Sequence, residues 1–172
     1  DYAIMGCVEL TSPGKTGSMS ANALLLSRLL DMTLRNGNSK TLAVTVKNEG
    51  PKTGDPDTFE TFDELLSAFA EQARVLIGKI VKASDLRDRL YEANLPAPYI
   101  SAFMQGTLES KKDVTSGGAT YDLTGISIIN SIANVTDSLY VIKKLVFEQR
   151  KYSIRQILEA VDHNFTGYEA LH

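Results

Sequence analysis

The sequence predicts a helix-rich α/β fold, and two observations lead to this prediction. Two short segments, 2–8 and 41–46, have the apolar or alternating pattern of strands. Longer segments between and after them carry apolar residues at helical spacing. The 172 residues, of which 43% are hydrophobic and 23% charged, are enough for one domain with its own core.

Strands and helices alternate in the first half of the chain. In order, we expect a buried strand over 2–8, a loop rich in Thr, Ser, Gly and Pro over 10–20, a helix over 21–35, a strand over 41–46 and a loop over 48–57. The helix is predicted because Leu25, Leu29 and Met32 recur at helical spacing, and Asn36-Gly37 supplies its C-terminal stop.

Helices dominate the second half. In order, we expect a long helix from 61 to about 95, a short helix or helix–strand junction over 99–109, a glycine-rich loop over 111–125, an apolar helix over 128–147 and a last helix from 153 to about 164. Capping boxes begin two of these helices, at Thr61 to Glu64 and at Ser153 to Gln156. Pro96 and Pro98 end the long helix.

Composition and charge argue against several classes of function. The formal net charge of −3 gives no basic surface for nucleic acid. No apolar run approaches the roughly 20 residues of a membrane span. One cysteine and two histidines do not favour a zinc site. A single cysteine excludes an intramolecular disulfide framework and suits a reducing cytosol, so we expect a cytoplasmic protein.

The only cysteine, Cys7, lies two residues before Glu9 in Gly6-Cys7-Val8-Glu9. In an extended segment, residues i and i+2 share a face, so a thiol and a carboxylate would meet the same substrate. A lone cysteine is more often a small buried apolar residue, and a non-catalytic α/β domain stays open. A cysteine hydrolase also stays open, with His163 or His172 as the imidazole that generates the thiolate.

Other motifs favour structural roles. Pro13-Gly14-Lys15-Thr16 lacks the earlier glycine of a phosphate-binding loop, because that position is Glu9; we expect this loop to shape a wall of the site. Gly117-Gly118 permits tight backbone geometry. Three carboxylates are expected to be surface groups, caps or partners of basic residues: Glu109, Asp122 and Asp137.

Several segments, taken in order, resemble the glycyl radical enzymes of the pyruvate formate-lyase superfamily. The segments are Gly6-Cys7-Val8-Glu9, Pro13-Gly14-Lys15-Thr16, Gly54-Asp55-Pro56 with 58–64, Gly117 to Tyr121 with Thr124-Gly125, and 133–139 with 142–147. The resemblance covers nearly the whole chain. The Cys-x-Glu form resembles the dehydratase, amine-lyase and decarboxylase group, because pyruvate formate-lyase itself carries two adjacent cysteines.

The resemblance implies an internal fragment: residues 1–172 would be part of a ten-stranded α/β barrel domain, with the thiyl-radical loop over 4–20. The absence of an initiator methionine and a signal peptide fits this expectation. A glycine radical in a C-terminal domain would move to Cys7, whose thiyl radical would take hydrogen from the substrate, while Glu9 assists proton movement. The full enzyme would be an anaerobic lyase that cleaves a C–O, C–N or C–C bond, and the fragment alone would be inactive.

The resemblance also implies partners. No cofactor or metal would bind at this site, and a separate activase using S-adenosylmethionine and an iron–sulfur cluster would install the radical. The other partners would be a small organic substrate, the remainder of the polypeptide and further copies in a homo-oligomer. Thr166-Gly167-Tyr168 resembles the end of the radical motif but lacks the preceding Arg-Val, so Gly167 is expected to form a turn. The C-terminal glycyl radical domain is thus expected to be absent from these residues.

Overall fold

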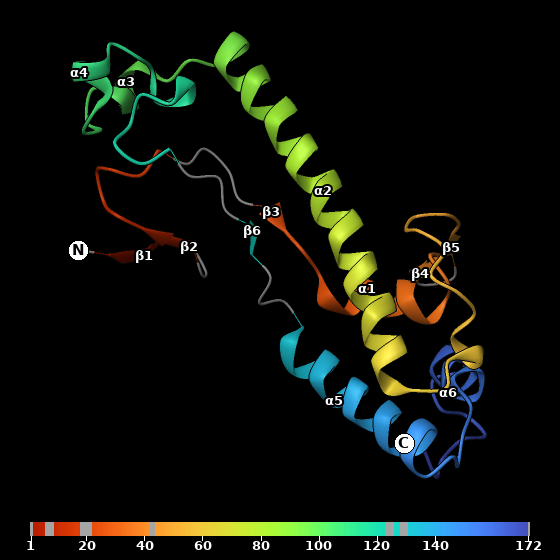
Figure 1. Cartoon of the computed structure of the whole chain (residues 1–172). Helices are drawn as coiled ribbons and strands as arrows, with labels where there is room; N and C mark the ends of the chain where they lie inside the picture. Colours follow the sequence, from red (N-terminus) through yellow and green to blue (C-terminus); the bar gives the residue numbers. More distant parts are fainter. Residues whose placement is uncertain are drawn as a thin grey trace. The chain divides into compact units, whose positions relative to one another are not determined.

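Backbone contacts divide the chain into two units (Figure 1). The computed structural model describes residues 2–5, 9–17, 22–41, 44–122, 126–127 and 131–171, with the backbone alone for Met5, Glu9, Ile126 and Ser127. Unit 1 comprises Asp1–Leu24 and Ile77–Ile128, and unit 2 comprises Leu25–Leu76 and Ile129–His172. Helix α2 (Phe62–Asn94) contributes residues to both units.

Unit 1 is built from short elements around the C-terminal part of α2. They are β1 (Ala3–Met5), β2 (Glu9–Thr11), β3 (Asn22–Ala23), α3 (Pro98–Ser101), α4 (Thr107–Ser110), a 3-10 turn (Val114–Ser116) and β6 (Ile126–Ser127). β1 and β2 pair antiparallel, whereas β3 and β6 pair in parallel. The Asn22 side chain fixes β3 to α2, because its amide donates to Ser84 Oγ at 2.8 Å and accepts from Arg87 at 3.0 Å.

Unit 2 is built around an apolar core. Its elements are α1 (Leu26–Leu34), β4 (Ser39–Thr41), β5 (Val44–Val46), a 3-10 turn (Pro56–Thr58), the start of α2, α5 (Ile132–Ile142), a π-helical segment (Lys143–Glu148) and α6 (Ile154–Asp162). Seven buried apolar side chains form the core: Leu30, Leu34, Leu65, Val135, Ile142, Ile154 and Ile157. Each such side chain stabilises the folded state by roughly 1.5–3 kcal/mol.

The two predicted capping boxes are confirmed, and they set the starts of α2 and α6. Thr61 Oγ1 accepts from the Glu64 N–H at 3.3 Å, and the Glu64 carboxylate accepts from the Thr61 N–H at 3.1 Å. Ser153 and Gln156 exchange the same pair of bonds at 3.1 and 2.8 Å. Each box satisfies two N–H groups that the first helical turn leaves free.

The predicted stop of α1 is also confirmed. Gly37 has a φ of +79° and its N–H donates to the Met32 carbonyl at 2.7 Å. A Cβ atom at this position would collide with the backbone carbonyl of Pro51. Glycine is therefore required here both by the left-handed backbone and by the close approach of another segment.

The two strand predictions need correction. Residues 2–8 were expected to form one buried strand; β1 covers Ala3–Met5, residues 6–8 lie outside the described residues, and the Tyr2 and Ile4 side chains are 79% and 71% exposed, so the expected burial is wrong. Residues 41–46 were expected to form one strand, but β4 and β5 form an antiparallel pair with Thr41 opposite Val44. Apolar and polar residues alternate in the same way on both sides of a reversal, so the pattern alone cannot locate one.

Two helices begin later than the sequence predicts. α1 begins at Leu26 instead of 21, and α5 begins at Ile132 instead of 128. In both cases nearby residues pair as strands: Asn22 lies opposite Ile126 in the β3–β6 ladder. This pairing joins segments far apart in the sequence, and helical periodicity carries no information about it.

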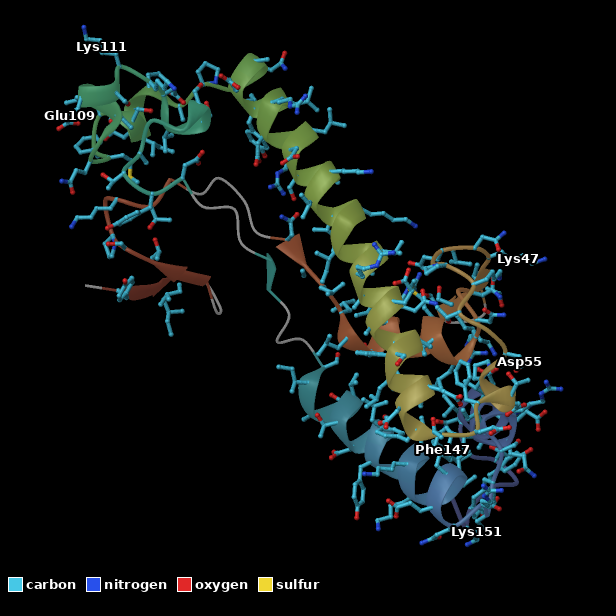
Figure 2. The ribbon with its side chains drawn as sticks, viewed as in Figure 1. Lys47, Asp55, Glu109, Lys111, Phe147 and Lys151 are labelled. Atoms are coloured by element: carbon cyan, nitrogen blue, oxygen red, sulfur yellow. The ribbon has the colours of Figure 1, made fainter. Side chains whose placement is uncertain are left out.

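Apolar side chains of the helices differ in their exposure. Those of residues 145–147, Leu76 and Ile80 are half-buried, and Phe147, labelled in Figure 2, packs edge-on against Phe62 with ring centroids 5.9 Å apart. Leu86 and Leu90 of α2 are instead 61% and 55% exposed. The expected long helix is confirmed over 33 residues, and its two most exposed large apolar side chains, Leu86 and Leu90, lie in its second half.

Candidate functional site

Of the two predicted reactive residues, Glu9 is the first residue of β2, in the first strand pair of unit 1. Met5 lies opposite Glu9 and Ala3 opposite Thr11, so the ladder fixes the backbone of Glu9 at the start of β2. Cys7 and the side chain of Glu9 lie outside the described residues. That both side chains face one substrate stays a prediction.

The chain leaves β2 through a tight turn, residues 12–17, that is held by its own polar groups. The Ser12 carbonyl accepts from the N–H groups of Lys15 and Thr16 at 3.0 Å each, and the Thr16 hydroxyl accepts from the Ser12 N–H at 3.0 Å. Gly14 has a φ of +72°, which glycine adopts without steric cost. Ser12 is buried, so the path of the chain is fixed directly after β2.

A second stretch of unit 1, residues 105–121, forms hydrogen bonds with this turn (Figure 1). We call it the clamp segment. The Gln105 N–H donates to the Gly14 carbonyl at 2.7 Å, and the Tyr121 N–H donates to the Lys15 carbonyl at 2.9 Å. The Gly17 N–H donates to the Tyr121 carbonyl at 2.8 Å, which completes a parallel bridge between Thr16 and Tyr121. These directional contacts give the turn one register on the clamp segment.

Side-chain packing reinforces the same contact. Gly17 lies against Val114 and Ala119, which are only 2% and 8% exposed. A Cβ atom at position 17 would stand 2.7 Å from Ala119 Cβ and 2.9 Å from Val114 Cγ2. The turn and the clamp segment therefore fit closely only because residue 17 has no side chain.

The predicted tight geometry at Gly117-Gly118 is confirmed. Gly117 has a φ of +72°, and a Cβ atom on Gly118 would collide with the carbonyl of Lys112. The Gly118 N–H donates to the Asp113 carbonyl at 3.0 Å. The pair of glycines thus lets the clamp segment fold back on itself beside the turn.

Asp113 organises the middle of the clamp segment, and the sequence analysis assigned it no role. Its carboxylate accepts from the Ala97 N–H at 3.1 Å, from Ser101 Oγ at 2.8 Å and from the Thr115 N–H and hydroxyl at 2.9 and 2.7 Å. Burial acts to raise the pKa of Asp113, but the hydrogen bonds from Thr115, Ala97 and Ser101 outweigh it and lower the pKa to about 2. The sequence signal was Asp-Val-Thr, an aspartate that caps the N–H two residues ahead.

The Gly-Lys-Thr sequence of the turn does not form a phosphate cradle. The N–H groups of Lys15, Thr16 and Gly17 all donate to carbonyl oxygens of the protein. The next helix that the structure describes, α1, begins only at Leu26, so Thr16 does not stand in the first turn of a helix as the threonine of a phosphate-binding loop does. That this loop shapes a wall of the site stays a prediction.

The remaining predicted residues have surface roles. Glu109 is exposed and its carboxylate accepts from the Gly106 N–H at 3.1 Å; Figure 2 shows Glu109 and Lys111 projecting outward at α4. Gly167 lies in a turn with a φ of +80°, as expected. His163 is exposed at the end of α6, with its ring Nδ1 2.8 Å from the Glu159 carbonyl. The hydrolase alternative is not tested, because Cys7 lies outside the described residues.

Among the side chains that the structure describes, no three His, Cys, Asp or Glu residues come together as ligands of a metal ion would. In the same part of the chain, no helix combines the length and the apolar character needed to cross a bilayer.

Comparison with known sequences gives matches along the whole chain. The family model described as Pyruvate formate lyase-like matches residues 1–172. (2S)-3-sulfopropanediol dehydratase of Klebsiella oxytoca is 35% identical and covers 100% of this chain, and isethionate sulfite-lyase of Desulfovibrio desulfuricans is 29% identical and covers 98%. 4-Hydroxyphenylacetate decarboxylase glycyl radical subunit of Clostridioides difficile is 21% identical. The chain spans about a fifth of the length of these relatives, with 20% of each covered.

Comparison with solved structures gives the same grouping. Hydroxyproline dehydratase of Clostridioides difficile, solved with trans-4-hydroxy-L-proline bound, superposes with a TM-score of 0.87 at 32% identity. The match covers 98% of this chain and 21% of the dehydratase. A glycyl radical enzyme of Archaeoglobus fulgidus superposes with a TM-score of 0.82 at 30% identity, covering 99% of this chain and 21% of that one.

Proposed function

Because the chain belongs to the pyruvate formate lyase-like family, we propose that it supplies the thiyl-radical segment of an anaerobic glycyl radical lyase, with Cys7 and Glu9 as its catalytic residues. The observation that carries the proposal is the family match over residues 1–172, which includes the Cys-x-Glu sequence whose glutamate, Glu9, begins β2. The turn after β2 supports the proposal, because its hydrogen bonds to the clamp segment fix the backbone that follows β2 and Glu9.

Family membership confirms the resemblance drawn from the sequence. The superpositions confirm that the chain is a helix-rich part of an α/β barrel of the glycyl radical enzyme type. The relatives are dehydratases and lyases, so the family is one of enzymes. The glycyl radical itself is a property of the family and lies in its C-terminal domain.

The proposed reaction begins when the radical reaches Cys7. The thiyl sulfur takes a hydrogen atom from the substrate: a C–H bond breaks, an S–H bond forms and the unpaired electron moves to carbon. Glu9 takes a proton from a hydroxyl group on that carbon and passes it to the leaving group on the adjacent carbon. The bond between that carbon and the leaving group breaks, and the leaving group keeps the bonding electrons. The product radical then takes the hydrogen atom back from Cys7, so the thiyl radical is restored without net oxidation.

We propose that the enzyme cleaves a C–O or C–S bond, in preference to the alternatives of a C–C or C–N bond. The dehydratase and the sulfite-lyase are 35% and 29% identical to this chain, whereas the decarboxylase is 21% identical. The names of the first two point to small hydroxylated or sulfonated compounds as the class of substrate. A hydroxyl group on such a compound gives the Glu9 carboxylate a proton to accept.

The other partners are proposals of the same kind. The radical glycine and further walls of the pocket would come from the remainder of the polypeptide, since the chain spans about a fifth of its relatives. A separate activase with S-adenosylmethionine and an iron–sulfur cluster would install the radical, and the full enzyme would be a homo-oligomer. The 172 residues alone are expected to show no turnover.

The test uses the full-length enzyme, activated under anaerobic conditions and offered three probes: (2S)-3-sulfopropanediol, trans-4-hydroxy-L-proline and isethionate. We expect a glycyl radical signal by electron paramagnetic resonance and elimination product from at least one probe. Glu9→Gln should lower turnover by about 100-fold or more, because an amide cannot accept the proton. Glu92→Gln, which alters an exposed carboxylate of α2, should leave turnover unchanged. No radical signal, or equal turnover in both variants, would contradict the proposal.

A further inference from the structure

Asp113 is linked to the reactive segment by a continuous series of contacts within unit 1. We propose that Asp113 is a positioning residue for Cys7 and Glu9, because it holds the clamp segment in the path that fixes the turn after β2. This inference rests on the proposed function, since it assigns Asp113 a part in that reaction. Asp113 itself lies in the clamp segment, and the turn is the element that touches β2.

The first step of the link is the way Asp113 fixes its own surroundings. Its side chain ties the clamp segment to α3 through the Ala97 N–H and the Ser101 hydroxyl. Its backbone carbonyl accepts from the N–H groups of Ser116 and Gly118 at 2.9 and 3.0 Å. One residue thus sets both the place and the curvature of the chain from 113 to 118.

The second step carries that position to the turn. Val114, whose N–H donates to Ser101 Oγ at 2.9 Å, packs with Ala119 on Gly17. Gln105, at the start of the clamp segment, joins its end to the turn. The Gln105 carbonyl accepts from the Thr120 N–H at 2.9 Å, and the Gln105 N–H donates to the turn. A shift of the clamp segment therefore moves the surface on which the turn rests. Hydrogen transfer between sulfur and carbon depends on near-attack geometry, for which a misplacement of about 1 Å can cost about 100-fold in rate.

The chemistry of the site favours a carboxylate there. Within the described part of the chain, the groups that donate to Asp113 are neutral N–H or O–H groups, and both carboxylate oxygens accept. An amide of the same shape has one acceptor oxygen, and its NH2 group would stand against the Ala97 N–H, which now donates to both oxygens at 3.1 Å. The low pKa of Asp113 agrees with this arrangement, since it keeps the acceptor charged at neutral pH.

The test compares Asp113→Asn with Asp122→Asn in the full-length activated enzyme. Asp122 is an exposed carboxylate that directly follows the clamp segment, so it serves as a matched control. The substrate is the probe that wild-type enzyme converts, used with hydrogen and with deuterium at the abstracted position. The readouts are glycyl radical content, kcat, KM and the isotope effect on kcat.

For Asp113→Asn we expect wild-type radical content, a kcat lower by about 10- to 100-fold, a smaller change in KM and a larger isotope effect. Asp122→Asn should match wild type. A purely structural role would lower radical content or soluble yield without changing the isotope effect of the enzyme that remains. Asp113→Asn with wild-type kcat and isotope effect would overturn the inference.

If Asp113→Asn gives no soluble enzyme, two milder variants decide. Ser101→Ala and Thr115→Val each remove one side-chain donor and keep the carboxylate. Both should lower kcat and raise the isotope effect in the same direction at normal radical content, and wild-type values in both would overturn the inference. Wild-type enzyme that converts none of the probes would instead contradict the proposed function.

Discussion

Unit 2 buries seven apolar side chains from α1, α2, α5 and α6 in one cluster, whereas the buried residues of unit 1 include several hydroxyl groups. Among the described residues, unit 1 buries four hydroxyl side chains (Ser12, Ser84, Ser101 and Thr107) and three apolar ones, whereas unit 2 buries three polar side chains (Thr33, Ser39 and Gln72) beside its larger apolar core. Apolar burial depends on area and has little directional preference, while hydrogen bonds fix distance and angle. Unit 1, which contains the proposed reactive segment, therefore depends more on hydrogen bonds, the contacts that fix atomic positions most closely.

Charged contacts follow the same division. In unit 2, Arg35 pairs with Asp162 at 2.7 Å and with Asp31 at 2.6 Å, and Lys40 pairs with Asp162 at 3.1 Å. The hydrogen bond from Arg35 is the main cause that lowers the pKa of Asp162. In unit 1, the Asp113 carboxylate is satisfied by neutral donors instead. In unit 2, ion pairs to Asp162 join separate elements, and in unit 1 a carboxylate bonded to neutral donors shapes a loop.

The largest effect that we expect from this comparison concerns the core of unit 2. Leu65→Ala should lower the free energy of unfolding by about 2–5 kcal/mol, because Leu65 is fully buried and its removal leaves a cavity. Urea titration of the full-length protein, with hydrogen exchange of peptides from α1 and α5, measures it. Leu66→Ala, at the exposed neighbour, is the control. Equal effects of the two variants would show that the apolar cluster does not stabilise unit 2.

The next effect concerns the contact between the turn and the clamp segment. Gly17→Ala should destabilise unit 1 by about 1–3 kcal/mol, because the new methyl group meets Ala119 and Val114 at less than normal contact distance. Hydrogen exchange of peptides from the clamp segment should rise. Gly78→Ala is the matched control: a Cβ atom there has nothing within 4 Å, so α2 should be stabilised by about 0.5–1 kcal/mol. Unchanged exchange in Gly17→Ala would contradict the close fit.

A weaker effect concerns association. Leu86 and Leu90 expose apolar surface on α2 in unit 1, so the isolated 172-residue chain is expected to self-associate. Light scattering should show a mass that rises with concentration, and Leu86→Glu with Leu90→Glu should reduce it. A stable monomer at all concentrations would count against an uncovered apolar face on α2.

The smallest effect is a pH dependence of the clamp segment. The pKa of Asp113 is about 2 in the folded protein against an ordinary value of 3.8. Its stabilising contribution is therefore complete above about pH 5 and is lost as the pH falls through 3.8 toward 2. Amide exchange of residues 113–121 should be slower in wild type than in Asp113→Asn at pH 6, and the difference should shrink on acidification. A difference that stays constant with pH would show that the carboxylate charge does not matter.

The helices could be predicted because their start and stop signals are local in the sequence. The strand pairs between distant segments could not be predicted, because no local pattern marks them. The capping boxes at Thr61 and Ser153 and the stop at Gly37 act within one helical turn, so the sequence showed them directly. The pairing of Asn22 with Ile126 and of Thr16 with Tyr121 joins distant segments, and no periodicity reports it. The late starts of α1 and α5 follow from the first of these pairings.

For the candidate site, the sequence pointed to the proposed reactive pair, which stays a prediction, and gave little sign of the residues that support it. Cys7 and Glu9 were singled out because a thiol and a carboxylate at i and i+2 form a recognisable chemical pair. Asp113 was not singled out, because its importance comes from Ala97 and Ser101, which lie on another element. Only its contact with Thr115 was visible in the sequence.

The central claim is that Cys7 carries the radical to the substrate. Its most direct test is Cys7→Ser in the full-length enzyme, activated anaerobically and offered the probe that wild type converts. A hydroxyl group is a poor radical relay, so we expect a glycyl radical signal equal to that of wild type and no detectable product. Product formed at the wild-type rate by Cys7→Ser would contradict the claim.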